Sequence, residues 1–208
     1  MSNIQSAPTQ VLQYPVMEHF YTLQGEGYWT GTPAYFIRLG GCDVGCHWCD
    51  VKESWPEAGH PMLSPEDLVA FIRETPARRV VITGGEPFMH DLTALTRVLK
   101  EAGYLLHCET SGTCLLSGNW DWICFSPKKF KAPLPIWYEI ADELKVIVYQ
   151  NHDLEWGLGH AQRCRPETKL FYQPEWNSAH RLPAITEFVK SHPNWRISLQ
   201  THKYLQIP

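Results

Sequence analysis

The segment LGGCDVGCHWCDVK, residues 39–52, places three cysteines within eight positions, directly after a short apolar run. Cys42, Cys46 and Cys49 have the spacing C-x3-C-x2-C, and Trp48 precedes the last of them. Structural zinc usually takes four closed ligands from two separated pairs, and no second pair follows here. Three thiolates in one loop suit an iron–sulfur cluster that keeps one iron open to a small molecule. Zinc stays as the alternative, and a disulfide is disfavoured because the cysteines number seven.

The composition limits the remaining possibilities. The 208 residues suit one domain, and a net charge of −4 argues against nucleic-acid binding. No apolar stretch is long enough to span a membrane. Residues 1–12 form a polar stretch without a secretory signal, which predicts a disordered tail and a cytoplasmic protein.

Strand-like and helix-like segments alternate along the chain. Helices are expected over 64–75, from Asp91 to Gly103, and over 178–191. The expected strands are the apolar runs 34–40, 78–83, 104–109, 120–125, 143–149, 169–173 and 195–200. Such alternation predicts an α/β domain, with about six parallel strands and about three crossover helices.

Nearly every expected strand ends in a polar or glycine-rich motif. Besides the cysteine segment, these motifs are TGGEP (83–87), ETSGT (109–113), SPKK (126–129), QPEW (173–176) and QTHK (200–203). Each one alone is an ordinary turn sequence. In parallel barrels the carboxyl ends of the strands converge, so together these motifs indicate one shared site.

The cysteine spacing with its aromatic residue, followed by TGGEP, resembles the radical S-adenosylmethionine superfamily. The resemblance implies a [4Fe–4S] cluster on Cys42, Cys46 and Cys49, with S-adenosylmethionine bound to the open iron and cleaved to a 5′-deoxyadenosyl radical. It also implies a partial TIM-like barrel.

Longer stretches resemble the 7-carboxy-7-deazaguanine synthase family within that superfamily. They are FYTLQGEGYWTGTPAYFIRLGGC (20–42), VVITGGEP (80–87), ETSGT, SPK and LQTHKYLQIP (199–208). The resemblance implies a trimmed barrel, a homodimer and a low-potential, flavodoxin-like electron donor. It implies that 6-carboxy-5,6,7,8-tetrahydropterin is converted to 7-carboxy-7-deazaguanine, with loss of ammonia, in queuosine or related 7-deazapurine biosynthesis.

The resemblance also assigns site residues. Those implied to contact S-adenosylmethionine are Trp48, Cys49, Asp50, Gly84, Gly85, Glu86, Gly112, Ser126, Pro127, Lys128 and Gln173. Those implied to contact the pterin are Leu23, Gln24, Gly25, Glu26, Arg38, Thr110, His202 and Pro208. From its chemistry alone, Arg38 suits a bidentate clamp on a carboxylate, although a surface salt bridge is the alternative for Arg38 and Glu26.

One position departs from the family pattern. Relatives commonly carry Thr after the CxxCD motif, where its hydroxyl helps to hold Mg²⁺, and this chain carries Val51. Because Mg²⁺ requires oxygen ligands, water or the charge of Lys52 would have to substitute, or Mg²⁺ is not used in this way. Two other functions remain open: a glycyl-radical enzyme activase, and a non-catalytic metal-binding or redox-sensing protein.

Overall fold

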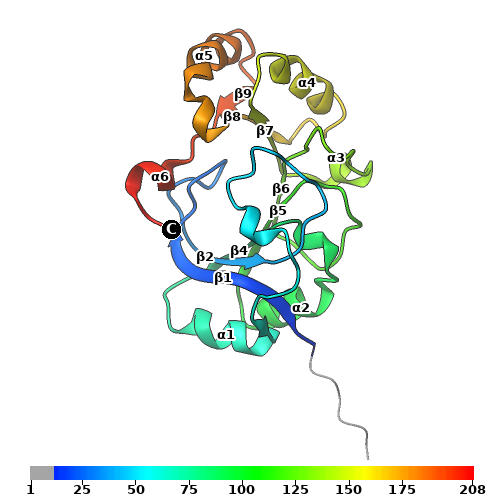
Figure 1. The fold of residues 1–208 in the computed structure, drawn as a ribbon, viewed down its shortest axis with the longest axis vertical. Helices are drawn as coiled ribbons and strands as arrows, with labels where there is room; N and C mark the ends of the chain where they lie inside the picture. Colours follow the sequence, from blue (N-terminus) through cyan, green and yellow to red (C-terminus); the bar gives the residue numbers. More distant parts are fainter. Residues whose placement is uncertain (1–11) are drawn as a thin grey trace, which may run out of the picture.

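The computed structural model describes residues 12–208, whose strands form one sheet that curves into an open, partial barrel (Figure 1). The strand order is β3-β1-β2-β4-β5-β6-β7-β8-β9. The strands are β1 (Tyr14–Leu23), β2 (Pro33–Leu39), β3 (Met62–Leu63), β4 (Arg79–Gly84), β5 (Leu105–Thr110), β6 (Trp122–Phe125), β7 (Glu143–Val148), β8 (Lys169–Pro174) and β9 (Trp195–Ile197).

The seven strands expected from the sequence are all present, and they form the parallel part of the sheet. Neighbouring strands in the order β2, β4, β5, β6, β7, β8 and β9 pair in parallel. The seven parallel strands agree with the expected number of about six. β1 and β3 add an antiparallel edge that was not predicted. β1 lacks a clear apolar signature because polar residues such as Glu18 and His19 interrupt it.

Helices fill most of the crossovers between the parallel strands. They are α1 (Pro65–Arg73), α2 (Thr93–Glu101), α3 (Ile136–Ile140), α4 (His152–Ala161), α5 (Leu182–Ser191) and α6 (Thr201–Leu205), with short 3-10 turns η1 (Lys52–Ser54), η2 (Pro87–Met89) and η3 (Trp176–Arg181). α1 to α5 lie outside the curved sheet, and α6 lies at its open side (Figure 1). Five crossover helices replace the three expected.

Local hydrogen bonds confirm the predicted start of α1 and explain why α2 starts later than predicted. The Ser64 hydroxyl accepts from the Asp67 amide, and the Asp67 carboxylate accepts from the Ser64 amide at 3.0 Å, which is a capping box. Asp91 does not begin the second helix; its carboxylate accepts from the Thr93 amide at 2.9 Å, and the helix starts at Thr93.

α4 was missed because its sequence contains two glycines, which weaken the helical signal. Gly157 permits close packing of α4 on β8. A Cβ at this position would lie 2.6 Å from the Tyr172 ring, whose hydroxyl donates to the Leu154 carbonyl at 2.6 Å. Gly157 therefore weakens the helical signal in the sequence, and in the structure it allows α4 to pack closely on β8.

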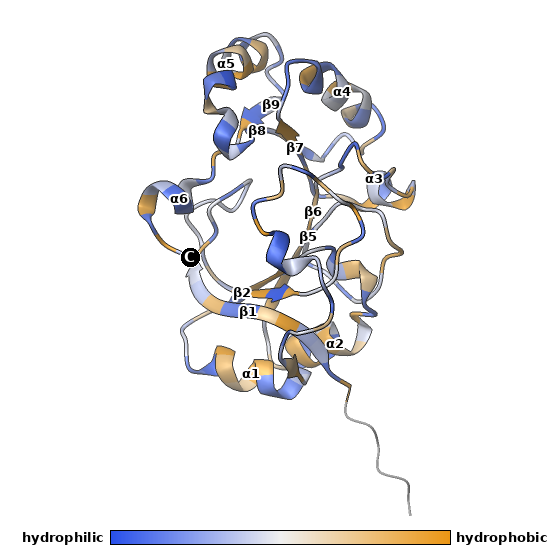
Figure 2. Cartoon of the chain, in the orientation of Figure 1, coloured by the Kyte–Doolittle hydropathy of each residue, from blue (hydrophilic) through white to orange (hydrophobic). Residues whose placement is uncertain are grey.

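Successive residues of each strand point to opposite faces of the sheet. On β7, Leu144 and Val146 belong to the main core beneath the helices, whereas Glu143 and Lys145 point into the barrel. Figure 2 shows apolar and polar residues on different sides of α1 and α2, as expected for helices that cover an apolar sheet face. The main core thus lies outside the barrel, and the inner face is left for polar groups.

The predicted tail, residues 1–12, lies outside the described residues except for Leu12. Within 12–208, no helix has both the length and the apolar character needed to cross a membrane.

Candidate active site

A cavity of about 420 Å³ opens at the carboxyl ends of the parallel strands. This volume falls within the usual range for small-molecule sites. Its wall combines the loops after β2, β4, β5, β6 and β8 with the loop after β1 and with α6. The prediction that the strand-end motifs share one site is supported by this geometry.

The cysteine loop, residues 40–50, forms one side of the cavity. Its start is fixed by backbone hydrogen bonds from Gly41 to Ser54 (2.8 Å) and from Cys42 to Trp55 (3.0 Å). Cys42, Cys46 and Cys49, called the three loop thiols below, all line the cavity and are unpaired.

The three loop thiols fit a polynuclear cluster better than a single ion. Among residues 12–208, no three His, Cys, Asp or Glu side chains converge closely enough to ligate one metal ion. A four-iron cluster instead takes each thiolate on a different iron, so its ligands stand apart. Burial raises the pKa of Cys42, and that of Cys46 to about 11, so loading with iron must remove protons from these thiols.

The other cysteines play no part in this loop. Cys108 and Cys124 are buried within β5 and β6, as expected for cysteines that act as small apolar residues. Neither these nor Cys114 and Cys164 line the cavity. The structure therefore supplies no fourth cysteine at the site within the described residues.

The TGGEP turn packs directly on the cysteine loop. Gly85 donates to the Leu39 carbonyl at 3.1 Å, and Glu86 donates to the Gly41 carbonyl at 2.8 Å. A Cβ at Gly85 would lie 2.6 Å from the Cβ of Cys42 and closer still to the Gly41 oxygen. Glycine at this position thus allows the two motifs to touch.

The Glu86 side chain joins TGGEP to ETSGT. Its carboxylate accepts from the Thr110 hydroxyl at 2.7 Å and from the Ser111 amide at 2.8 Å, and the residue is 1% exposed. With these donors Glu86 lies behind the cavity wall rather than in it. Its implied contact with S-adenosylmethionine stays a prediction.

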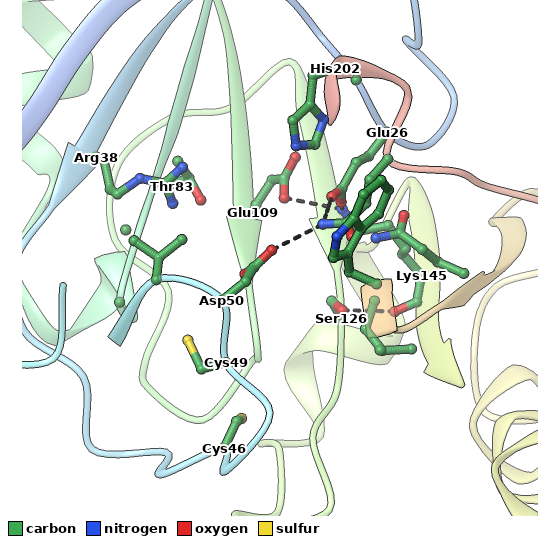
Figure 3. A pocket seen from close by; sticks show the side chains of 18 of the residues that line it. Glu26, Arg38, Cys46, Cys49, Asp50, Thr83, Glu109, Ser126, Lys145 and His202 are labelled. Atoms are coloured by element: carbon green, nitrogen blue, oxygen red, sulfur yellow. Dashed lines mark hydrogen bonds and ion pairs between the residues drawn. The ribbon is translucent and has the colours of Figure 1, made fainter. Parts of the chain in front are cut away.

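Two half-buried carboxylates and a buried lysine form the polar floor (Figure 3). The Lys145 ammonium donates to Glu26 at 2.5 Å and to Glu109 at 3.1 Å. Gln24 donates to the second oxygen of Glu109 at 3.0 Å. Burial favours the neutral acid, but Lys145 outweighs it and lowers the pKa of Glu109 to about 2.

α6 closes the cavity opposite the strand ends. Thr201 donates its amide to the Gly25 carbonyl at 2.9 Å, and Lys203 and Gln200 donate to Asp50 at 2.6 and 3.1 Å. Burial raises the pKa of Asp50, but these donors outweigh it and the net shift is downward. Burial lowers the pKa of His202, which favours a neutral imidazole facing the cavity.

Arg38 lines the cavity from β2, and its Nε donates to Glu18 at 2.6 Å. Arg38 and Glu26 do not pair with each other, since Glu26 bonds Lys145. At the chain end, Thr22 donates its hydroxyl to the Pro208 carbonyl at 3.3 Å, which holds Pro208 beside the cavity.

The structure brings most predicted site residues into one cavity. Lining it are Leu23, Gln24, Gly25, Glu26, Arg38, Cys42, Cys46, Trp48, Cys49, Asp50, Val51, Gly84, Gly85, Thr110, Ser126, Lys128, Gln173, His202 and Pro208. Glu86, Gly112 and Pro127 do not line it. Sequence reasoning missed Lys145 and the role of Glu109. Lys145 belongs to no recognisable motif. The one sequence signal for it is a lysine within a mostly apolar strand.

Comparison with known proteins defines the class. The family model of the radical SAM superfamily matches residues 36–130, which include the cysteine loop and the TGGEP and ETSGT turns. With the partial barrel and the open cysteine loop, this places the chain among the radical S-adenosylmethionine proteins, which use a [4Fe–4S] cluster and S-adenosylmethionine.

Full-length relatives define the family more narrowly. The chain is 51% identical to 7-carboxy-7-deazaguanine synthase of Flavobacterium psychrophilum (99% of this chain, 98% of the relative). It is 48% identical to that of Synechocystis sp. (94% of each). The crystal structure of QueE from Escherichia coli superposes with a TM-score of 0.79 at 37% identity, covering 91% of this chain and 95% of the other. The chain belongs to the 7-carboxy-7-deazaguanine synthase family.

Proposed function

We propose that this protein is a radical S-adenosylmethionine enzyme that converts 6-carboxy-5,6,7,8-tetrahydropterin to 7-carboxy-7-deazaguanine with loss of ammonia. The observation that carries the proposal is one cavity with three unpaired loop thiols on one side and a carboxylate floor on the other. Near full-length identity to named synthases supports the same activity.

The three loop thiols are the residues that would hold the cluster. When bound, the cluster and S-adenosylmethionine supply a 5′-deoxyadenosyl radical, which is the hard chemistry of the reaction. The protein orients the reactants and excludes water. The backbone of Gly84 and Gly85, together with Ser126, Lys128 and Gln173, is suited to receive the cofactor because these groups line the same cavity as the three loop thiols.

The opposite side is suited to a pterin. Glu26 and Glu109 present acceptors that match the N–H groups of a pterin edge. Arg38 keeps its terminal guanidinium nitrogens for the substrate carboxylate, since only its Nε is bonded to Glu18. Thr110, His202 and Pro208 border the same space.

The Mg²⁺ ion expected from relatives does not fit the residues present. Val51 lines the cavity without a side-chain oxygen, and one oxygen of the Asp50 carboxylate already accepts from Lys203 and Gln200. Lys52 does not compensate, because it is exposed and lies 5.8 Å above the Trp55 ring. We therefore derive no step through Mg²⁺, which demands oxygen ligands.

We further infer a homodimer, a low-potential electron donor of the flavodoxin type and a cytoplasmic location, with no nucleic-acid partner. The seven unpaired thiols support a reducing compartment. The other inferences rest on family membership.

The direct test is an anaerobic assay with reconstituted protein, dithionite, S-adenosylmethionine and the carboxypterin. We expect 7-carboxy-7-deazaguanine by mass spectrometry. Formation of 5′-deoxyadenosine only with a protein partner would instead support the activase function. Bound zinc without brown chromophore, and no cofactor cleavage, would support a non-catalytic metal protein.

A further inference from the structure

Lys145 is a buried cation at the base of the cavity. The side chain is 3% exposed and projects from the inner face of β7, between the loop after β1 and the end of β5. Its ammonium donates to Glu26 and Glu109, which lie 83 positions apart in the chain but face the same nitrogen (Figure 3). A lysine almost never occupies such a place unless it is paired.

The two carboxylates keep capacity for further donors. One oxygen of Glu26 accepts from Lys145 and the other from Gln200 at 3.0 Å. Glu109 accepts from Lys145 and Gln24 in the same way. Each ionised carboxylate offers about four acceptor sites, so roughly half of them remain open.

Other ionisable groups surround this triad from every element packed against it. They are Glu143 on β7, His107 on β5, Arg79 on β4, Cys124 on β6, Lys128 after β6, Asp50 in the cysteine loop, and His202 and Lys203 on α6. Burial keeps His107 neutral, with a pKa of about 3, and raises the pKa of Glu143. Among the described residues, Lys145 is the cation bonded to both Glu26 and Glu109.

We propose that Lys145 is a positioning residue that holds Glu26 and Glu109 together as one acceptor array for a planar, N–H-rich edge of the substrate. This proposal rests on the proposed function for the identity of that substrate. Without the ammonium, two carboxylates in a poorly solvated site would repel each other, and one would take up a proton. A protonated carboxyl group would place its O–H donor against the N–H donors of the substrate, and this mismatch would weaken substrate binding.

The proposal predicts a pH-dependent loss of substrate affinity in Lys145→Met. Burial then acts unopposed by Lys145 and raises the pKa of Glu109. We expect KM for the carboxypterin to rise at least about tenfold at pH 6.5 and to recover toward pH 8.5. Wild type and Lys145→Arg should show a flat KM over this range, with the Arg variant within about threefold of wild type.

Two controls separate positioning from general damage. Lys190→Met removes an exposed lysine, 3.0 Å from Glu187 on α5, and should leave KM and its pH profile unchanged. Cleavage of S-adenosylmethionine without the pterin should keep the pH profile of wild type in Lys145→Met, because the Lys145 ammonium bonds Glu26 and Glu109 and not the three loop thiols. A KM that is unchanged, or raised equally at every pH and not rescued by Arg, overturns the proposal.

A substrate-free measurement keeps this test independent of the proposed function. Because the pKa of Glu109 is lowered in the folded state, the ionised carboxylate stabilises wild type above the unfolded pKa, near 4.5. In Lys145→Met the pKa of Glu109 is raised instead of lowered, so ionisation of Glu109 destabilises the folded state. The thermal midpoint of the variant should therefore fall further below that of wild type as the pH rises from 5 to 8. A deficit that is constant with pH overturns the proposal, even if the wild-type enzyme does not accept the carboxypterin.

Discussion

Gly85→Ala should slow the cleavage of S-adenosylmethionine while leaving the fold intact. The new methyl group would lie 2.6 Å from the Cβ of Cys42, whereas ordinary contacts begin at 3.4 Å. The Gly41 carbonyl oxygen would lie closer still, at 2.3 Å, so the cysteine loop must move by about 1.1 Å to restore an ordinary contact. A misplacement of about 1 Å typically costs about 100-fold in rate when reacting groups are aligned precisely.

The assay measures iron and sulfide content, circular dichroism and the rate of 5′-deoxyadenosine formation. We expect the Gly85→Ala variant to fold and to lose about two orders of magnitude in the rate of cofactor cleavage. Gly159→Ala is the matched control, since nothing lies within 4 Å of its added methyl group. That variant should cleave the cofactor at the wild-type rate. A Gly85→Ala enzyme with wild-type cleavage would refute the close-packing argument.

Three further predictions follow from the site and the core. Replacing any one of the three loop thiols by Ala should abolish turnover while circular dichroism stays native, whereas Cys164→Ala should remain active; unfolding of all three loop variants would contradict a catalytic cluster. Val51→Thr should increase the stimulation of turnover by Mg²⁺, and no gain in a metal titration would undercut the account of this position. Because of His107, the free energy of unfolding of wild type should fall by up to about 1.4 kcal/mol for each pH unit below pH 6.5, and His107→Leu should remove this loss. The reason is that burial lowers the pKa of His107 to about 3, so the unfolded chain binds the proton first as pH falls; urea titrations from pH 4 to 7 check it, and an unchanged slope would contradict it.

The parallel strands and most of the cavity were predictable because both depend on local patterns. Each inner strand is a short apolar run followed by a turn motif, and the topology brings the ends of parallel strands together. The cysteine loop and the TGGEP turn were recognisable for the same reason. Only the direct packing of Gly85 on Cys42 required coordinates.

The parts that could not be predicted depend on contacts distant in sequence. β1 is held by pairing with β2 and β3 rather than by its own composition. α4 is stabilised by packing on Tyr172 in spite of its glycines. The partners of Lys145 come from two other parts of the chain, so nothing near position 145 indicates them.

The alternation of faces along the inner strands has a consequence for how the enzyme tolerates change. On β7, Leu144 and Val146 face the helices, and Lys145 faces the cavity. Stability and chemistry are therefore carried by adjacent positions of the same strand, with a period of two residues. Libraries that vary only the cavity-facing positions leave the apolar layer intact, so any loss of stability is confined to the polar network around Lys145.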